Sequence, residues 1–173
     1  MNAMPFVTYR DLVSTFFSMD DGATGRDVVS SIVGWVERNS TTLVGSPYAD
    51  YGFGMILMMA GSVDNYRFGY FDRRDVDRIK RRVSEFKPSD VMAMCQFLRD
   101  LMEELVVVEV DKTCIRCGES YMLAYSAVSM YAIVYQCVAC GFSCFSDGSD
   151  LSGEGVRFLT EQELVSEGFV ASG

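Results

Sequence analysis

Two short stretches decide the fold of the second half of this chain, Cys114-Ile115-Arg116-Cys117-Gly118 and Cys137-Val138-Ala139-Cys140-Gly141. Each follows the pattern C-x-x-C-G, and 19 residues separate Cys117 from Cys137. Two cysteines three positions apart turn their sulfur atoms the same way around a tight bend, and the glycine lets the chain leave that bend with an unusual backbone angle. Four thiolates at this spacing can close on one tetrahedral ion. The sequence therefore predicts a metal site made of Cys114, Cys117, Cys137 and Cys140.

The two cysteine knuckles together resemble a zinc ribbon, and the resemblance covers about residues 112–146. It implies a small antiparallel β-structure around a structural Zn²⁺, with residues 119–136 forming the hairpin that returns the second pair to the first. Rubredoxin-like iron sites use similar knuckles, so iron stays open as an alternative metal. Cys144 is a fifth candidate ligand, for which we expect a packed position in a strand. Zinc ribbons serve many unrelated functions, so the resemblance predicts a site and a local fold only.

The cysteine set predicts a structural metal and not a catalytic one. A catalytic zinc keeps one coordination position open for water or substrate, whereas four paired cysteines fill all four positions. The chain has no histidine, which removes Ser-His-Asp and Cys-His catalysis. It also lacks the G-x-x-x-x-G-K-[ST] loop that binds phosphates. We therefore expect a protein that is not an enzyme.

Length and composition indicate a globular protein with a real core, since apolar residues make up 49% of the 173 positions. The first residues, Met1-Asn2-Ala3-Met4-Pro5, lack the basic segment and apolar run of a signal peptide. No apolar run approaches the ~18 residues that a membrane span requires. We expect a cytoplasmic protein without membrane association, whose cysteines serve metal binding and packing instead of disulfides.

The predicted fold class is α+β, with an N-terminal helical bundle in residues 1–105. Helix starts are expected at Thr8, Thr24, Ser46, Asp72 and Ser89. The clearest helical stripe places Val28, Ile32 and Val36 on one face, with Trp35 at the edge of the core. Residues 51–59 read as a buried helix ending near Gly61, residues 62–71 as an aromatic connector with a short strand, and Cys95 as a small buried apolar side chain.

Residues 106–173 are predicted to form the zinc ribbon and a short C-terminal helix, packed on the helices as one unit. Strands are expected at residues 105–110, 121–125, 129–135 and 142–145, with a short one at 156–159. Thr160-Glu161-Gln162-Glu163 has the capping-box pattern and opens a helix over 161–166, which Gly168 ends. The ribbon strands are rich in apolar residues, so we expect one of their faces to pack on the helices or on a partner.

Charge is distributed unevenly, and it guides the prediction of a partner. The net charge is −9; residues 88–173 hold 13 acidic and 4 basic residues, whereas residues 72–87 hold 7 basic and 4 acidic ones. An acidic half repels nucleic acid and attracts basic proteins. We expect a basic protein partner, for example a basic toxin neutralised by this chain as an immunity or inhibitor protein. The alternative is a zinc-ribbon factor that binds nucleic acid or is associated with transcription, with the Arg73–Arg82 helix as the segment that could grip phosphates.

The ribbon or the terminal helix is expected to take part in the contact with the partner. The acidic residues expected to steer that partner are Glu103, Glu104, Glu161 and Glu163, whereas Arg81 and Arg82 are expected to play no part.

Overall fold

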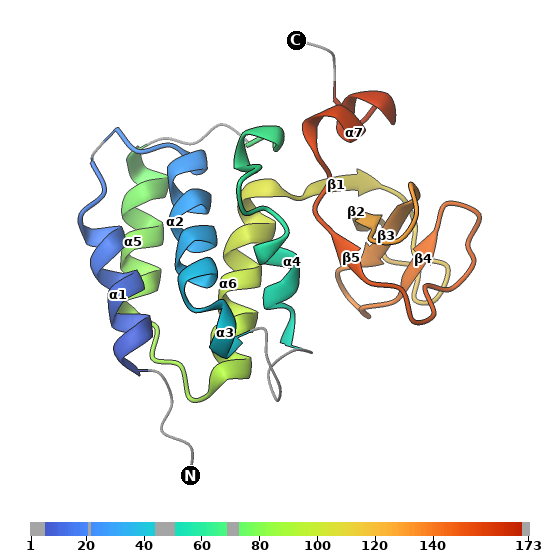
Figure 1. The fold of residues 1–173 in the computed structure, drawn as a ribbon. Helices are drawn as coiled ribbons and strands as arrows, with labels where there is room; N and C mark the ends of the chain where they lie inside the picture. The colour runs from blue at the N-terminus through green and yellow to red at the C-terminus, as the bar shows by residue number, and fades with distance from the viewer. Residues whose placement is uncertain (1–5, 21, 44–50, 69–72, 171–173) are drawn as a thin grey trace. The chain divides into compact units, whose positions relative to one another are not determined.

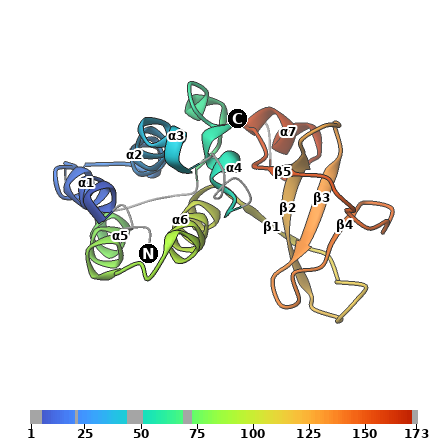
Figure 2. The same cartoon turned by 60° about the horizontal axis from the view of Figure 1, so that its bottom comes forward.

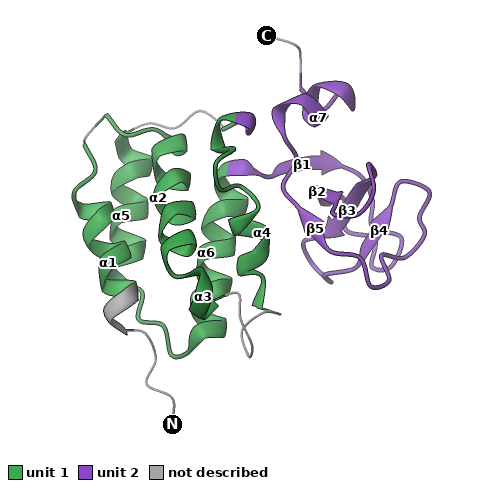
Figure 3. Cartoon of the chain, in the orientation of Figure 1, with its two compact units in different colours: residues 1–64, 68–105 green, residues 65–67, 106–173 purple. Residues whose placement is uncertain are grey.

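The computed structural model describes residues 6–20, 22–43, 51–68 and 73–170. It has the predicted α+β class, with a helical region first, an antiparallel sheet after it and a helix near the C-terminus (Figure 1). The chain divides into two compact units (Figure 3). The helical unit holds residues 1–64 and 68–105, and the ribbon unit holds residues 65–67 and 106–173.

The helices of the first unit follow one another in the order α1 (Phe6–Phe17), α2 (Gly25–Arg38), α3 (Ser40–Leu43), α4 (Phe53–Leu57), α5 (Arg73–Glu85) and α6 (Val91–Val106). A short 3₁₀ helix, η2 (Val63–Asn65), lies between α4 and α5. The longer helices α1, α2, α5 and α6 run side by side, which Figure 2 shows nearly end-on. Their facing stripes form the core of the unit.

Helix α2 illustrates how local sequence signals build this unit. Thr24 and Asp27 form a reciprocal capping box: the Thr24 N–H donates to the Asp27 carboxylate at 2.7 Å, and the Asp27 N–H donates to the Thr24 hydroxyl at 3.3 Å. Such a box satisfies N–H groups that the first helical turn leaves without partners. The predicted stripe is buried, and Trp35, expected at the core edge, is fully buried instead.

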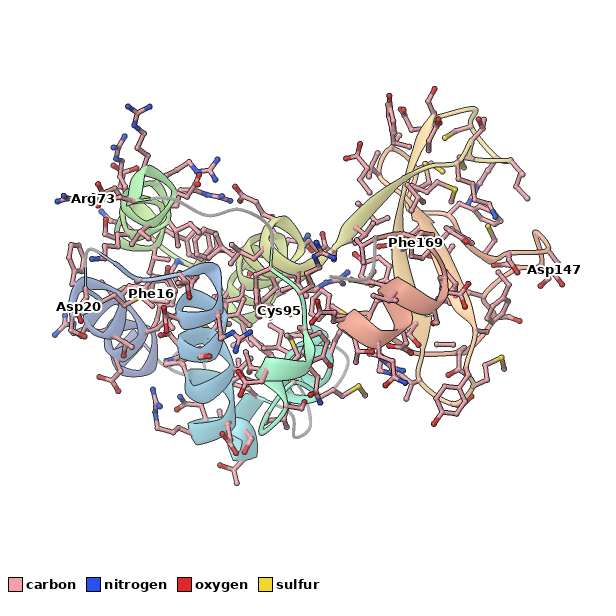
Figure 4. The ribbon with its side chains drawn as sticks, turned by 90° about the horizontal axis from the view of Figure 1, so that it is seen from above. Phe16, Asp20, Arg73, Cys95, Asp147 and Phe169 are labelled. Carbon is pink, nitrogen blue, oxygen red and sulfur yellow. The ribbon has the colours of Figure 1, made fainter. Side chains whose placement is uncertain are left out.

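Contacts between distant helices hold the bundle together. The Tyr9 hydroxyl on α1 donates to the Val83 carbonyl on α5 at 2.9 Å. The ring of Phe86, just after α5, stacks on the ring of Phe97 on α6, with the two centroids 4.0 Å apart. Phe16, labelled among the helices in Figure 4, is fully buried on α1. Deep burial of such large apolar side chains stabilises each by about 1.5–3 kcal/mol relative to exposure.

Several predicted helix boundaries need correction. Helix α1 begins at Phe6, so Thr8 lies inside its first turn and not at its N-cap. Helix α6 is capped by Asp90 and not by Ser89, because the Asp90 carboxylate accepts the Ala93 N–H at 2.7 Å. Carboxylates and hydroxyls are similarly good caps, so two adjacent candidates cannot be ranked from sequence. The predicted starts at Ser46 and Asp72 lie outside the described residues.

The segment between α3 and α5 is less regular than predicted. The buried helix expected over residues 51–59 is reduced to α4, which starts after Gly52 in a left-handed conformation with φ of 89°. The part of the 62–71 connector that the structure describes contains η2 and no strand. Burial still follows the apolar pattern here, since Phe53, Ile56 and Met59 are fully buried.

The ribbon unit contains the strands β1 (Val108–Asp111), β2 (Tyr121–Ala127), β3 (Ile133–Cys137), β4 (Ser143–Phe145) and β5 (Val156–Arg157), followed by helix α7 (Glu161–Ser166). The strand order is β1-β2-β3-β4, β5 pairs with β2, and all pairs are antiparallel. In the central hairpin, Met122 pairs with Cys137 and Ala124 with Tyr135.

Two predicted strand starts are wrong. Helix α6 continues to Val106, so β1 begins at Val108 instead of residue 105. The strand expected from residue 129 begins at Ile133, because residues 128–132 form the hairpin loop. The Ala127 N–H closes this loop by donating to the Ala132 carbonyl at 2.9 Å. The apolar residues of this loop have the composition typical of a strand, but they do not form one.

The ribbon covers one of its faces with its own C-terminal segment. Leu159 and Leu164 pack on Ala124 of β2, with Tyr135 and Phe169 beside them. The predicted capping box that opens α7 is present, with Thr160 and Glu163 bonded reciprocally. The apolar excess of the ribbon strands is therefore explained by burial under α7 and the segment that follows it.

Candidate metal centre

The two cysteine knuckles share one backbone geometry. In each, the N–H of the first cysteine, Cys114 or Cys137, donates to the carbonyl five residues later at 2.8 Å. The N–H of the glycine donates back to that cysteine's carbonyl, at 2.9 Å for Gly118 and 3.0 Å for Gly141. These glycines have φ of 80° and 68°, a left-handed conformation that costs other residues about 1–2 kcal/mol. The glycine in each C-x-x-C-G motif is therefore required by the turn.

The structure brings the sulfur atoms of the four predicted ligands together. Cys114 Sγ lies 3.8 Å from Cys140 Sγ, and Cys117 Sγ lies 3.5 Å from Cys137 Sγ. All four sulfurs lie within 4.8 Å of one another. Metal–sulfur bonds of about 2.3 Å in a regular tetrahedron separate the sulfurs by about 3.8 Å. The cluster thus fits one tetrahedral metal ion, and its all-thiolate donors suit zinc or iron.

The pKa values of Cys114 and Cys117 are shifted in opposite directions. Desolvation raises the pKa of Cys114, but hydrogen bonds from backbone N–H groups of its knuckle and from neighbouring thiols outweigh it and bring the pKa to about 7. A backbone hydrogen bond from Glu119 lowers the pKa of Cys117, whereas its contacts with the other cysteines raise it to about 12. One ionised sulfur therefore disfavours ionisation of the next. A bound cation offsets this repulsion and allows all four to act as thiolates.

The centre is buried on one side and open on the other. Cys114 and Cys137 are 1% exposed, whereas Cys117 and Cys140 are exposed. Cys144 lies in β4, where it pairs with Tyr135 and is buried in an apolar cluster with Cys114 and Cys137. The four-sulfur cluster does not include it. Cys144 therefore packs behind the knuckles, in the strand position expected for it.

Cys95 belongs to the helical unit and is remote in sequence from the knuckles. Cys95 is 2% exposed on α6, where Figure 4 labels it, and its thiol donates to the Tyr51 carbonyl. Burial raises the pKa of this thiol to about 11, although Arg99 opposes the shift. Cys95 thus serves as a small packed side chain, as the sequence predicted.

Most of the acidic residues expected to steer a partner already have partners within the fold. Arg78 and Arg82 of α5 both pair with Glu104 of α6, with 2.8 Å between Arg78 and Glu104. Glu103 pairs with Arg99 on the same helix at 3.2 Å. The residues of these pairs lie 4 to 26 positions apart in the sequence. Only the Arg99–Glu103 pair, at a spacing of four, matches a helical spacing that can be recognised from sequence.

Glu163 is even more tightly engaged, because it closes the α7 capping box and pairs with Arg157 at 2.6 Å. Desolvation raises the pKa of Glu163, but the bonds from Arg157 and Thr160 prevail and lower it to about 2. Of the four carboxylates named from sequence, Glu104 and Glu161 are exposed, and Glu161 lies in the ribbon unit. Charge reversal at Glu163 would disturb the fold as well as any binding surface.

Comparisons with protein-family models, with curated proteins and with solved structures found no match for this chain. In the residues that the structure describes, no helix has the length and apolar character needed to cross a membrane. The four-cysteine cluster and the charges around it are therefore the features of this chain that bear on its function.

Proposed function

We propose that this chain is a non-enzymatic binding protein that uses a structural zinc to hold an acidic ribbon, and that the ribbon binds a basic protein partner. The observation that carries the proposal is the charge of the ribbon. Residues 106–173 contain nine acidic and three basic residues. The exposed acidic residues in this segment are Glu109, Asp111, Asp147, Asp150, Glu161 and Glu167. Four thiolates on one dication add about −2 to this surface.

The sulfur cluster supports a structural role for the metal. Four thiolates complete a tetrahedral shell and leave no position at which a substrate or water could be activated. Zinc is proposed over iron because Zn²⁺ has a single oxidation state, needs no redox partner and favours tetrahedral thiolate sites. The ion would fix the two knuckles relative to each other and so hold the surface of the ribbon in one shape.

The competing function, nucleic-acid binding through α5, has less support. Two of its cationic side chains, Arg78 and Arg82, are paired with Glu104, and Lys80 donates to the Met19 carbonyl at 2.7 Å. At least three of the six basic residues of this helix are therefore already engaged by other groups of the same chain. A phosphate backbone would have to compete with these contacts, and the net charge of −9 opposes its approach.

The specific partner in this proposal is a basic toxin. Acidic inhibitor proteins can meet basic enzymes at high rates because complementary fields steer the encounter. This chain would act as an immunity or inhibitor protein by covering the basic surface of such an enzyme. The association rate should then fall steeply as salt screens the charges.

A titration at low salt tests the proposal. The probes are a labelled octapeptide of alternating arginine and glycine, a duplex DNA and a single-stranded DNA, each added to the metal-loaded protein. We expect the peptide to bind in a salt-dependent way and both nucleic acids to bind far more weakly. Micromolar binding of nucleic acid that is lost on neutralising Arg73, Arg74, Arg81 and Arg82 would overturn the proposal. Elemental analysis of the same sample should find about one zinc per chain.

A further inference from the structure

A groove of about 540 Å³ opens in the ribbon unit where β3 begins and β4 ends. Its lining comes from the hairpin loop, from β3 and from the loop after β4, whose tip carries Asp147 (Figure 4). Glu167, just after α7, closes its rim. The groove lies within one unit, so its shape depends on the sheet and α7 alone. Its volume suits one long side chain and the backbone on either side of it.

Aromatic and thioether groups form the apolar part of the groove. Tyr131 in the hairpin loop is 100% exposed and Met130 is 50% exposed, so neither is used to fill the core. Tyr135 of β3 also lines the groove. The Lys112 ammonium lies 3.8 Å from the centroid of the Tyr135 ring, which shows within this chain that the ring attracts a cation. Large apolar side chains left in water at a concave surface are typical of binding sites.

The charged side chains that line the groove, Asp147 and Glu167, are both negative, and the Lys112 ammonium lies beside them on the Tyr135 ring. Asp147 and Glu167 are exposed, and no lysine or arginine is among the lining residues. In the described part of the chain, neither carboxylate forms an ion pair. Bonds from the Ser149 hydroxyl and backbone keep the pKa of Asp147 below its usual value, so it is ionised at neutral pH. Two carboxylates in the same groove as the exposed Tyr131 ring attract a cation and repel phosphate.

We propose that this groove binds an arginine side chain of the basic partner, an inference that rests on the proposed function and locates its contact. The guanidinium would stack on Tyr131 while its N–H groups bond to Asp147 and Glu167. Arginine fits better than lysine because its planar fork can stack on a ring and bond to carboxylates at the same time. Its aliphatic stem would cover Met130.

Paired variants of the full metal-loaded chain test the groove with the arginine–glycine octapeptide. Tyr131→Ala and Glu167→Gln change the groove, while Tyr121→Ala and Glu109→Gln make the same chemical changes on β2 and β1, outside it. Tyr131 is fully exposed, so its loss should leave folding and metal content unchanged. We expect each groove variant to weaken binding about three- to tenfold and each control less than about twofold.

The outcomes separate this inference from the proposed function. If the unmodified chain does not bind the peptide, both fail. If the unmodified chain binds but the groove variants bind as tightly as their controls, the groove is not the arginine site and the acidic ribbon as a whole remains the binding surface. A lysine–glycine octapeptide that binds as tightly as the arginine one overturns the assignment to arginine. An uncharged apolar octapeptide that competes for the groove overturns the assignment to a basic segment.

Discussion

Replacing Cys137 with serine is expected to unfold the ribbon unit and to leave the helical unit folded. Cys137 is 1% exposed, its sulfur lies 3.5 Å from that of Cys117, and it also ends β3. The substitution removes one corner of the sulfur tetrahedron with little change in volume. Cys144→Ser is the matched control, because Cys144 is 2% exposed in the same apolar cluster and lies outside the set of four.

The expected magnitude follows from the energetics of metal ligation. Structural zinc binds finger peptides with about 10–16 kcal/mol, so equal division among four ligands assigns about 2.5–4 kcal/mol to each. A unit of this size has a free energy of unfolding of about 3–10 kcal/mol. Losing one ligand therefore removes a large part of the stability of the ribbon. The control carries the same buried hydroxyl, at a cost of about 1–3 kcal/mol, so the difference between the variants measures ligation.

The assay uses a reporter in each unit. Trp35 is the only tryptophan of the chain and is fully buried in the helical unit, so its fluorescence follows that unit alone. Hydrogen exchange at β2 and β3 amides follows the ribbon, and elemental analysis counts the metal. Cys137→Ser should lose metal and ribbon protection without a shift in Trp35 emission. Retention of one metal equivalent by Cys137→Ser would refute the ligand assignment, and a shift in Trp35 emission would refute the independence of the two units.

Three further predictions concern the rest of the chain. The pKa of Glu163 should be lowered from its usual 4.5 to about 2, so its bond to Arg157 should stabilise α7 at neutral pH and be lost as the pH falls from about 4.5 toward 2. A midpoint above about pH 4 in a carbon-13 titration of this carboxyl would contradict the prediction. Leu98→Ala should lower the free energy of unfolding of the helical unit by about 2–5 kcal/mol, because this side chain is fully buried; urea denaturation followed by tryptophan fluorescence measures the change, and metal content should not alter. Glu104→Gln should cost less than about 1 kcal/mol in the same assay, because the paired side chains are 32–53% exposed; a loss above about 2 kcal/mol would show that the pair does more than a surface ion pair.

Features set by neighbouring residues were predictable from the sequence. The capping boxes at Thr24 and Thr160 and the buried stripe of α5 need only residues three or four positions apart. The cysteine pairs belong to the same kind, because each C-x-x-C-G encodes its own turn. Predicting the hairpin required only that the segment between the two knuckles is long enough to bring one knuckle back to the other.

Features that depend on tertiary neighbours were not predictable. Met130 and Tyr131 have the apolar character of a strand, yet the β2–β3 register leaves them in the loop. The pairing of two α5 arginines with Glu104 joins residues 22 and 26 positions apart, and no local pattern marks such a pair. The groove likewise gathers residues from three segments, so Asp147 and Glu167 gave no signal before the fold was known.

The pairing of Met122 with Cys137 has a consequence for how the ribbon folds. Side chains alternate between the two faces of a strand, so a shift of one residue between β2 and β3 would turn Cys137 away from the knuckle of Cys117. A slipped hairpin can therefore supply only part of the sulfur set, and the ion binds it far more weakly. Metal binding would therefore favour the correct strand alignment, and a ribbon folding without the ion would have to find that alignment from side-chain packing alone.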